Sequence, residues 1–158
     1  MWALPGVRVV VPHQQKYEWD YTDGAVEVSR AGSVFCFQST VHQEASGKFI
    51  DPIVAHDPAA IHGLIQDRAG FHLPENDPRL PANVRVITLP AYSPELNPVE
   101  KLWDPMKDEI CHRVFATVEE LRGALTGWLK EFWSDGTRAL SLIGRGWLLA
   151  SVNAGPKG

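Results

Sequence analysis

Residues 89–103 read LPAYSPELNPVEKLW and join a short apolar run to the start of an amphipathic helix. Asn97 is a favourable N-cap, Pro98 suits the first helical position, and Glu100 falls at the third. The apolar side chains recur at helical spacing on one face: Val99, Leu102, Trp103, Met106 and Ile110. The stretch therefore predicts a helix that begins near Asn97 and presents Glu100 in its first turn.

Short apolar runs upstream of this helix predict strands. Residues 61–66 and 84–89 end in polar or proline-bearing turns, which is typical of buried parallel strands. Earlier in the chain, residues 7–11, 17–28 and 33–38 are rich in β-branched and aromatic side chains.

Two further helices are expected. Residues 41–55 carry apolar side chains at helical spacing, but Gly47 and Pro52 oppose a regular helix, so we expect a kink there. Thr117 and Glu120 form a capping box that opens the second helix. Its apolar face should pack as structural support and take no part in chemistry: Val118, Leu121, Leu125, Trp128, Leu129 and Phe132. Strands followed by alternating strands and helices predict an α/β layered fold.

The composition indicates one globular domain. The 158 residues are 44% hydrophobic, enough for a packed core, and we assign residues 1–150 to the domain and 151–158 to a C-terminal tail. The formal charge is −4, whereas DNA-binding domains are more often basic, so no tight DNA-binding module is expected here. Cys36 and Cys111 lack metal-binding or disulfide spacing. With no membrane-span or signal-peptide pattern in the sequence, we expect a cytoplasmic protein.

Asp67 and Glu100 are candidate metal ligands because each follows a predicted parallel strand. The carboxyl ends of such strands line the ligand crevice, so we expect both acids at one sheet edge, close enough to share a metal. Carboxylates suit Mg²⁺, and a pair of such ions can promote phosphoryl transfer.

Spacing alone also leaves structural interpretations open. Asp67 can cap the following turn, and Glu100 can be the capping-box partner of the Asn97 backbone amide. Some histidines could lie near a metal, but such residues are more often surface or core groups: His56, His62 and His72.

Two motifs resemble those of a known family. Residues 89–103 are similar to the signature PYSPELNPIExxW of the IS630-type DDE endonucleases, transposases of the Tc1/mariner superfamily, and the family glutamate matches Glu100. Residues 65–72, IQDRAGFH, resemble the family strand that ends in Asp-Gly/Asn-Ala-Gly-x-His. The second family acid therefore matches Asp67, and we add two supporting site residues, His72 and Asn97.

The resemblance runs from about residue 2 to about residue 147 and takes in residues 12–15 and 24–26. It implies a ribonuclease-H-like fold with a mixed sheet flanked by helices. In that family, three acids hold two Mg²⁺ or Mn²⁺ ions that cleave and rejoin DNA at the ends of an insertion element. The implied partners are transposon-end and target DNA. Self-association of transposase subunits is a further possible interaction, and no membrane partner is expected. The implied location is the bacterial cytoplasm, on the nucleoid when DNA is bound.

The family's first acid has no match in this sequence. In the family it lies on the central strand, ahead of the segment that matches residues 2–7, and a helix-turn-helix region lies further upstream. We therefore expect a partial endonuclease domain that lacks its first, central strand. Three acids fall in what would be the second strand, and none is expected to replace the missing one: Asp20, Asp23 and Glu27.

Two residues near the acids depart from the family pattern. Arg68 stands where the family usually has Gly or Asn, and a cation beside Asp67 would compete with a bound dication. Pro105 falls inside the helix of Glu100, where it removes a hydrogen bond at a cost of about 3 kcal/mol.

Three functions follow as hypotheses. The chain is the distal part of a transposase whose first acid lies upstream, or an inactive remnant that only binds DNA or transposase subunits. The third hypothesis is an unrelated metal-dependent phosphohydrolase that uses Asp67, His72 and Glu100 on small substrates.

Overall fold

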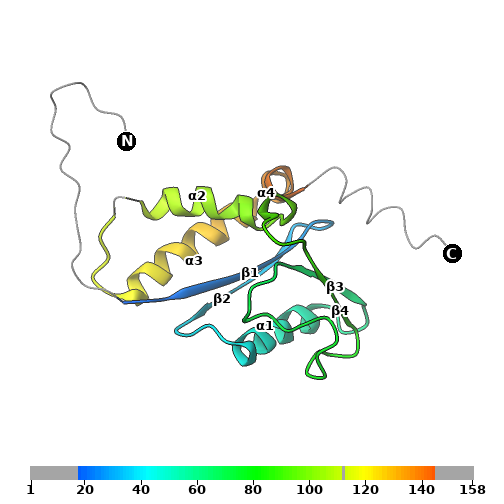
Figure 1. Cartoon of the computed structure of the whole chain (residues 1–158). Coiled ribbons are helices and arrows are strands. Elements are labelled where there is room, and N and C mark those ends of the chain that lie inside the picture. The colour runs from blue at the N-terminus through cyan, green and yellow to red at the C-terminus, as the bar shows by residue number, and fades with distance from the viewer. Residues whose placement is uncertain (1–17, 112, 145–158) are drawn as a thin grey trace.

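The computed structural model describes residues 18–111 and 113–144. Within them the chain forms two small sheets and a set of helices (Figure 1). The strand expected at residues 7–11 and the tail at residues 151–158 lie outside the described residues. Among the helices that the structure describes, none is long and apolar enough to cross a membrane.

A β-hairpin forms the middle layer of the fold. It consists of β1 (Tyr21–Glu27) and β2 (Gly32–Gln38), which pair antiparallel along their whole length. The two strands expected in this region are confirmed, and the turn between them includes Ala31 at a positive φ of 56°.

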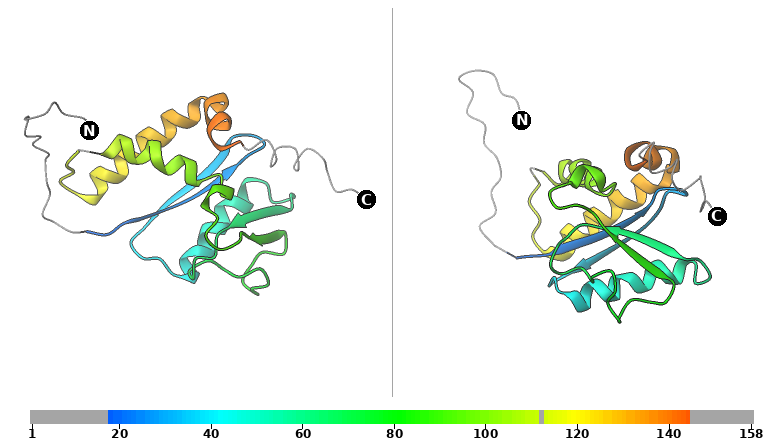
Figure 2. Two further views of the ribbon diagram at one scale, coloured as in Figure 1. Left: turned by 45° about the horizontal axis from the view of Figure 1, so that its top comes forward. Right: turned by 45° about the vertical axis from the view of Figure 1, so that its right-hand side comes forward.

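Helices cover both sides of the hairpin (Figure 2). On one side lie α2 (Glu100–Ile110), α3 (Val118–Ser134) and α4 (Gly136–Ile143). On the other side lies α1 (Gln43–His56), together with the strands β3 (His62–Gln66) and β4 (Val84–Thr88). The helices expected near residues 41–55, after Asn97 and after Thr117 are thus confirmed.

The larger core fills the space between the hairpin and α2 to α4. Its buried members are Ala31, Leu102, Met106, Leu125, Leu129, Phe132 and Ala139. The N-cap half of the expected capping box is confirmed, because Thr117 Oγ1 accepts a hydrogen bond from the Glu120 backbone N–H at 3.1 Å. The Glu120 carboxylate accepts the Ala116 N–H at 2.7 Å instead of the Thr117 N–H that a capping box uses. Leu125, Leu129 and Phe132 of α3 are among the buried members, so the apolar face of this helix is part of the core.

Pro105 lies inside α2, and the helix nevertheless continues to Ile110. Leu102 and Met106 on either side of it are buried, with exposed fractions of 0% and 7%. Burying two such side chains stabilises the helix by about 1.5–3 kcal/mol each, which offsets the hydrogen bond that proline removes.

A smaller core joins α1 to the parallel pair of β3 and β4. Its buried members are Ile50, Leu73, Val84 and Val86. The expectation that both strands are buried is only partly correct. In β4, Arg85 and Ile87 are exposed, and no residue of β3 is fully buried. The reason is that the packing of this core reaches only the face that carries Val84 and Val86.

The sheet topology differs from a single mixed sheet. Among the described residues, β1 and β2 form one antiparallel sheet and β3 and β4 form a separate parallel sheet. No ladder joins the two sheets in this part of the chain. The arrangement is a mixed α/β fold that is compatible with a ribonuclease-H-like domain.

Replacing Leu125 with Ala should lower the free energy of unfolding by about 2–5 kcal/mol, because the side chain is buried in the larger core. Chemical denaturation of both proteins measures the loss. Gly123→Ala is the matched control on the same helix, where a methyl group meets open space and should stabilise by about 0.5–1 kcal/mol. An unchanged stability for Leu125→Ala would show that this face of α3 is not core.

Candidate catalytic site

Asp67 stands where the parallel pair ends. It follows Gln66, the last residue of β3, and the Leu89 N–H donates to the Gln66 carbonyl at 2.8 Å, just beyond the paired strands. Its Oδ1 accepts the Ala69 N–H at 2.9 Å and lies 3.2 Å from His72 Nε2. The carboxylate therefore caps the turn, as one interpretation expected, and also contacts His72. Its second oxygen stays available to a ligand.

His72 connects Asp67 to helix α1. Its Nδ1 lies 3.3 Å from the Ser46 hydroxyl, while its Nε2 faces Asp67. Both contacts are satisfied together when Nε2–H donates to Asp67 and the Ser46 hydroxyl donates to Nδ1. The ring also packs on Phe71, with 4.5 Å between centroids. Ser46 was missed in the sequence because nothing in a helical serine 26 residues from His72 indicates such a contact.

Glu100 is the first residue of α2, so the helix begins later than Asn97. Asn97 still supports this start, since its Oδ1 accepts the Val99 N–H at 3.3 Å. Its own backbone N–H donates to the Pro94 carbonyl at 3.0 Å rather than to Glu100. The capping-box interpretation of Glu100 is therefore wrong.

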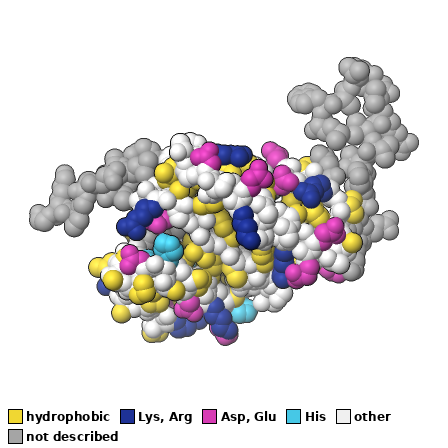
Figure 3. Space-filling view, turned by 180° about the vertical axis from the view of Figure 1, so that it is seen from behind, with side chains coloured by type: hydrophobic (Ala, Val, Ile, Leu, Met, Phe, Trp, Pro, Cys, Tyr) yellow, Lys and Arg dark blue, Asp and Glu magenta, His cyan; other side chains and the backbone are white. Residues whose placement is uncertain are grey.

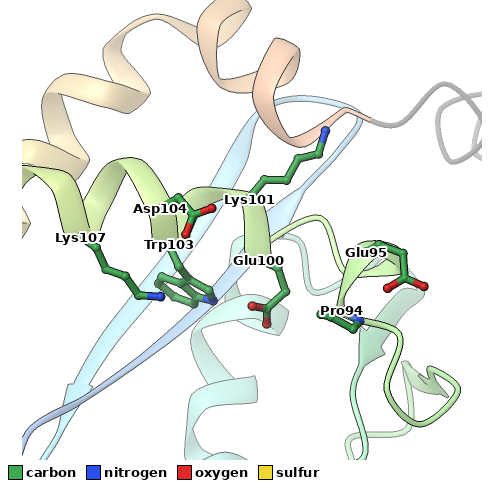
Figure 4. Close-up of a pocket in the computed structure, with 7 residues that line it drawn as sticks. All are labelled: Pro94, Glu95, Glu100, Lys101, Trp103, Asp104 and Lys107. Atoms are coloured by element: carbon green, nitrogen blue, oxygen red, sulfur yellow. The ribbon is translucent and has the colours of Figure 1, made fainter. Parts of the chain in front are cut away.

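The Glu100 carboxylate has no hydrogen bond or ion pair with any residue that the structure describes. It lines a shallow hollow of about 270 Å³ at the start of α2. In Figure 4, Glu100, Trp103 and Lys107 project to one side of the helix and Lys101 to another. Glu100 is thus free to take a ligand from this hollow.

Trp103 holds the first turn of α2 against the hairpin. A Cβ atom placed on Gly24 of β1 would lie 3.0 Å from the Trp103 ring and 2.6 Å from that of Phe35. Only glycine therefore allows this close approach without a shift of the two rings. The contact fixes the helix turn from which Glu100 projects.

The three upstream acids differ in their surroundings. Asp20 pairs with Arg122 at 2.7 Å, and Glu27 accepts a hydrogen bond from Ser29. Asp23 accepts a hydrogen bond from Gln38. Burial raises the pKa of Asp23 above 3.8, while the charge of His72 and the Gln38 hydrogen bond lower this pKa by a smaller amount. Asp23 is therefore the upstream acid that interacts with the His72 region, which its position in the second strand did not indicate.

Among the described residues, no hydrogen bond or ion pair joins the other two candidate histidines, His56 and His62, to Asp67 or Glu100. His62 Nε2 contacts the Asp57 carbonyl at 2.9 Å, and His56 occupies the last turn of α1.

The described residues match a Mg²⁺ or Mn²⁺ site in ligand type but not in number. Asp67 and Glu100 supply the carboxylate oxygens that these ions prefer. However, no group of three His, Cys, Asp or Glu side chains in residues 18–111 and 113–144 is placed to hold a metal. Asp67 is also absent from the lining of the Glu100 hollow. These two acids do not form a complete metal site by themselves.

A sequence model of the DDE superfamily endonucleases matches residues 1–122. The chain belongs to this family. The match includes Asp67, Glu100 and both motifs that carry them. The chain is also 34% identical over 110 residues to the uncharacterized protein y4pE/y4sA of Sinorhizobium fredii (strain NBRC 101917 / NGR234), covering 65% of this chain and 77% of that protein. No solved structure matches the chain significantly.

Asp23→Asn should stabilise the fold at neutral pH. The folded pKa of Asp23 lies above the ordinary 3.8, so its ionisation opposes folding increasingly as the pH rises from 3.8 through the folded pKa. Asparagine keeps an acceptor for Gln38 and removes the charge. Urea unfolding should show a gain over the natural chain near pH 7 that disappears near pH 3. A gain of equal size at both pH values would contradict a charge effect.

Proposed function

We propose that this chain is the distal part of the catalytic domain of an IS630-type transposase of the Tc1/mariner superfamily. The observation that carries the proposal is the family match over both acid-bearing motifs. Two structural facts support it: Asp67 follows a parallel strand, and the Glu100 carboxylate is free of partners in the described chain. The reaction would be metal-dependent cleavage and transfer of DNA strands at the ends of an insertion element.

In this proposal Asp67 and Glu100 are two of three ligands to Mg²⁺ or Mn²⁺. The bound ions would activate the attacking oxygen and stabilise the leaving oxygen in phosphoryl transfer. His72 occupies one oxygen of Asp67 and so orients the other. Asn97 shapes the entry into α2 through its bond to the Val99 N–H and so positions Glu100.

We propose that the third ligand is the family's first acid, which neither of the two motifs supplies. The support is that no three-ligand group occurs in the described residues and that the motifs match only the second and third family acids. The proposed partners are transposon-end and target DNA and other transposase subunits. The proposed location is the bacterial cytoplasm, with nucleoid association when DNA is bound.

The second candidate is an inactive remnant that binds DNA or transposase subunits without cutting. The incomplete ligand set in the described residues favours it. The phosphohydrolase hypothesis loses support because the family match is to endonucleases, which act on nucleic acid. The two remaining candidates differ only in whether the completed domain cleaves DNA.

The purified 158-residue chain should not nick transposon-end DNA in Mg²⁺ or Mn²⁺. Two carboxylates leave the ions poorly positioned for in-line attack, and small misplacements cost orders of magnitude in rate. A nicking assay compares this chain with a version extended at its N-terminus by the family's first strand and its Asp. The extended version should cut, and Asp67→Asn or Glu100→Gln should abolish the cut.

Each outcome of this assay decides between the candidates. Cutting by the extended version alone supports the transposase. An extended version that binds DNA but never cuts supports the remnant. Specific cutting by the short chain that is lost on Asp67→Ala would show that another residue supplies the third ligand, and the account of the missing acid would be wrong.

A further inference from the structure

A second hollow opens near the carboxyl end of the parallel pair, next to Asp67 in sequence. It has a volume of about 590 Å³ and is lined by Arg68, Pro74, Glu75, Asn76, Asp77, Pro78 and Thr88. We call it the Arg68 hollow. Thr88 is the last residue of β4, and Arg68 follows Asp67 directly. The hollow therefore adjoins the residue proposed as a metal ligand.

The acids of the Arg68 hollow already have partners. Glu75 accepts the Thr88 backbone N–H at 3.1 Å. Asp77 pairs with Arg79 at 2.7 Å, and hydrogen bonds from Arg79 lower its pKa to about 2. Both carboxylates are thus used in holding the loop together. Arg79 balances the charge of Asp77, whereas the Thr88 amide leaves the charge of Glu75 in place.

Arg68 and Asn76 are in the opposite situation. Both are exposed, and neither side chain has a hydrogen bond or ion pair with any described residue. No contact joins Arg68 to Asp67, which pairs with His72 instead. The hollow therefore offers a free guanidinium and a free carboxamide, which are donors that suit a phosphate.

Arg68 is one of six Lys and Arg side chains in residues 18–111 and 113–144 that have no carboxylate partner within 4 Å; the others are Arg85, Lys101, Lys107, Lys130 and Arg138. Five others have a carboxylate partner within 4 Å: Arg30, Lys48, Arg79, Arg113 and Arg122. On the face shown in Figure 3, the described Lys and Arg side chains are scattered among acidic and hydrophobic ones rather than joined in one basic surface.

We propose that the Arg68 hollow binds a backbone phosphate of the DNA strand that reaches Asp67. The inference rests on the proposed function and adds a substrate contact to it. A guanidinium can bind two phosphate oxygens at once, and Asn76 can donate to a third. Arg68 then places the strand beside the metal ligand, instead of opposing the metal as its position in the sequence suggested.

The test compares Arg68→Gln with Lys130→Gln. Both substitutions remove one positive charge from an exposed side chain, but Lys130 lies on α3, outside the hollow, and has no acidic partner among the described residues. Binding of a fluorescent DNA duplex is measured over a range of salt concentrations. Each lost phosphate contact lowers the slope of log affinity against log salt by about 0.9. We expect that change in slope for Arg68→Gln and almost none for Lys130→Gln.

A second arm uses inorganic phosphate alone and follows the side-chain NMR signals of Arg68 and Asn76. The inference is supported if phosphate shifts both signals in the natural chain and the shifts saturate. It also requires that phosphate does not shift the Asn76 signal in Arg68→Gln. If DNA binds but Arg68→Gln keeps the natural slope, the inference is wrong and the proposed function stands. Equal loss of slope in Lys130→Gln also overturns it. If phosphate shifts both signals but DNA does not bind, the hollow is only an anion site and the inferred DNA contact is wrong.

Discussion

Parallel pairing of β3 with β4, from His62↔Val84 to Gln66↔Thr88, determines where the candidate site residues leave the sheet. Both strands end at the same edge, so Asp67 and the segment that leads to α2 start side by side. The packing of Val84 and Val86 on α1 fixes this register. A slip of one residue would turn both side chains away from the core, so the hydrophobic core specifies the geometry of the site.

Two separate elements, α1 and the hairpin, hold the residues that surround this edge. α1 reaches the Asp67 loop through Ser46 and His72, whereas the hairpin supports α2 through the contact of Gly24 with Trp103. Asp67 and Glu100 are thus fixed by different parts of the fold, with His72 as the link on one side. Each acid therefore has its own backbone support, while the described residues hold no complete metal site.

The sequence predicted most elements because their signals are local. The capping residue Thr117 and the apolar stripe of α3 indicated a core helix, and the structure confirms both. The contacts of Ser46 with His72 and of Gln38 with Asp23 depend on tertiary packing and leave no trace in local spacing. The exposure of one face of β4 was missed for the same reason, since an apolar run does not show which neighbours cover it.

Broadening of backbone NMR signals by Mn²⁺ tests most directly whether Asp67 and Glu100 serve one site. Paramagnetic broadening is confined to nuclei near the ion. If both acids bind one ion, the Ala69 and Lys101 amides should broaden at the same Mn²⁺ concentration, and Asp67→Asn should relieve both. The Lys130 amide should stay sharp. Broadening of only one of the two amides, or at Lys101 regardless of Asp67→Asn, would contradict a shared site.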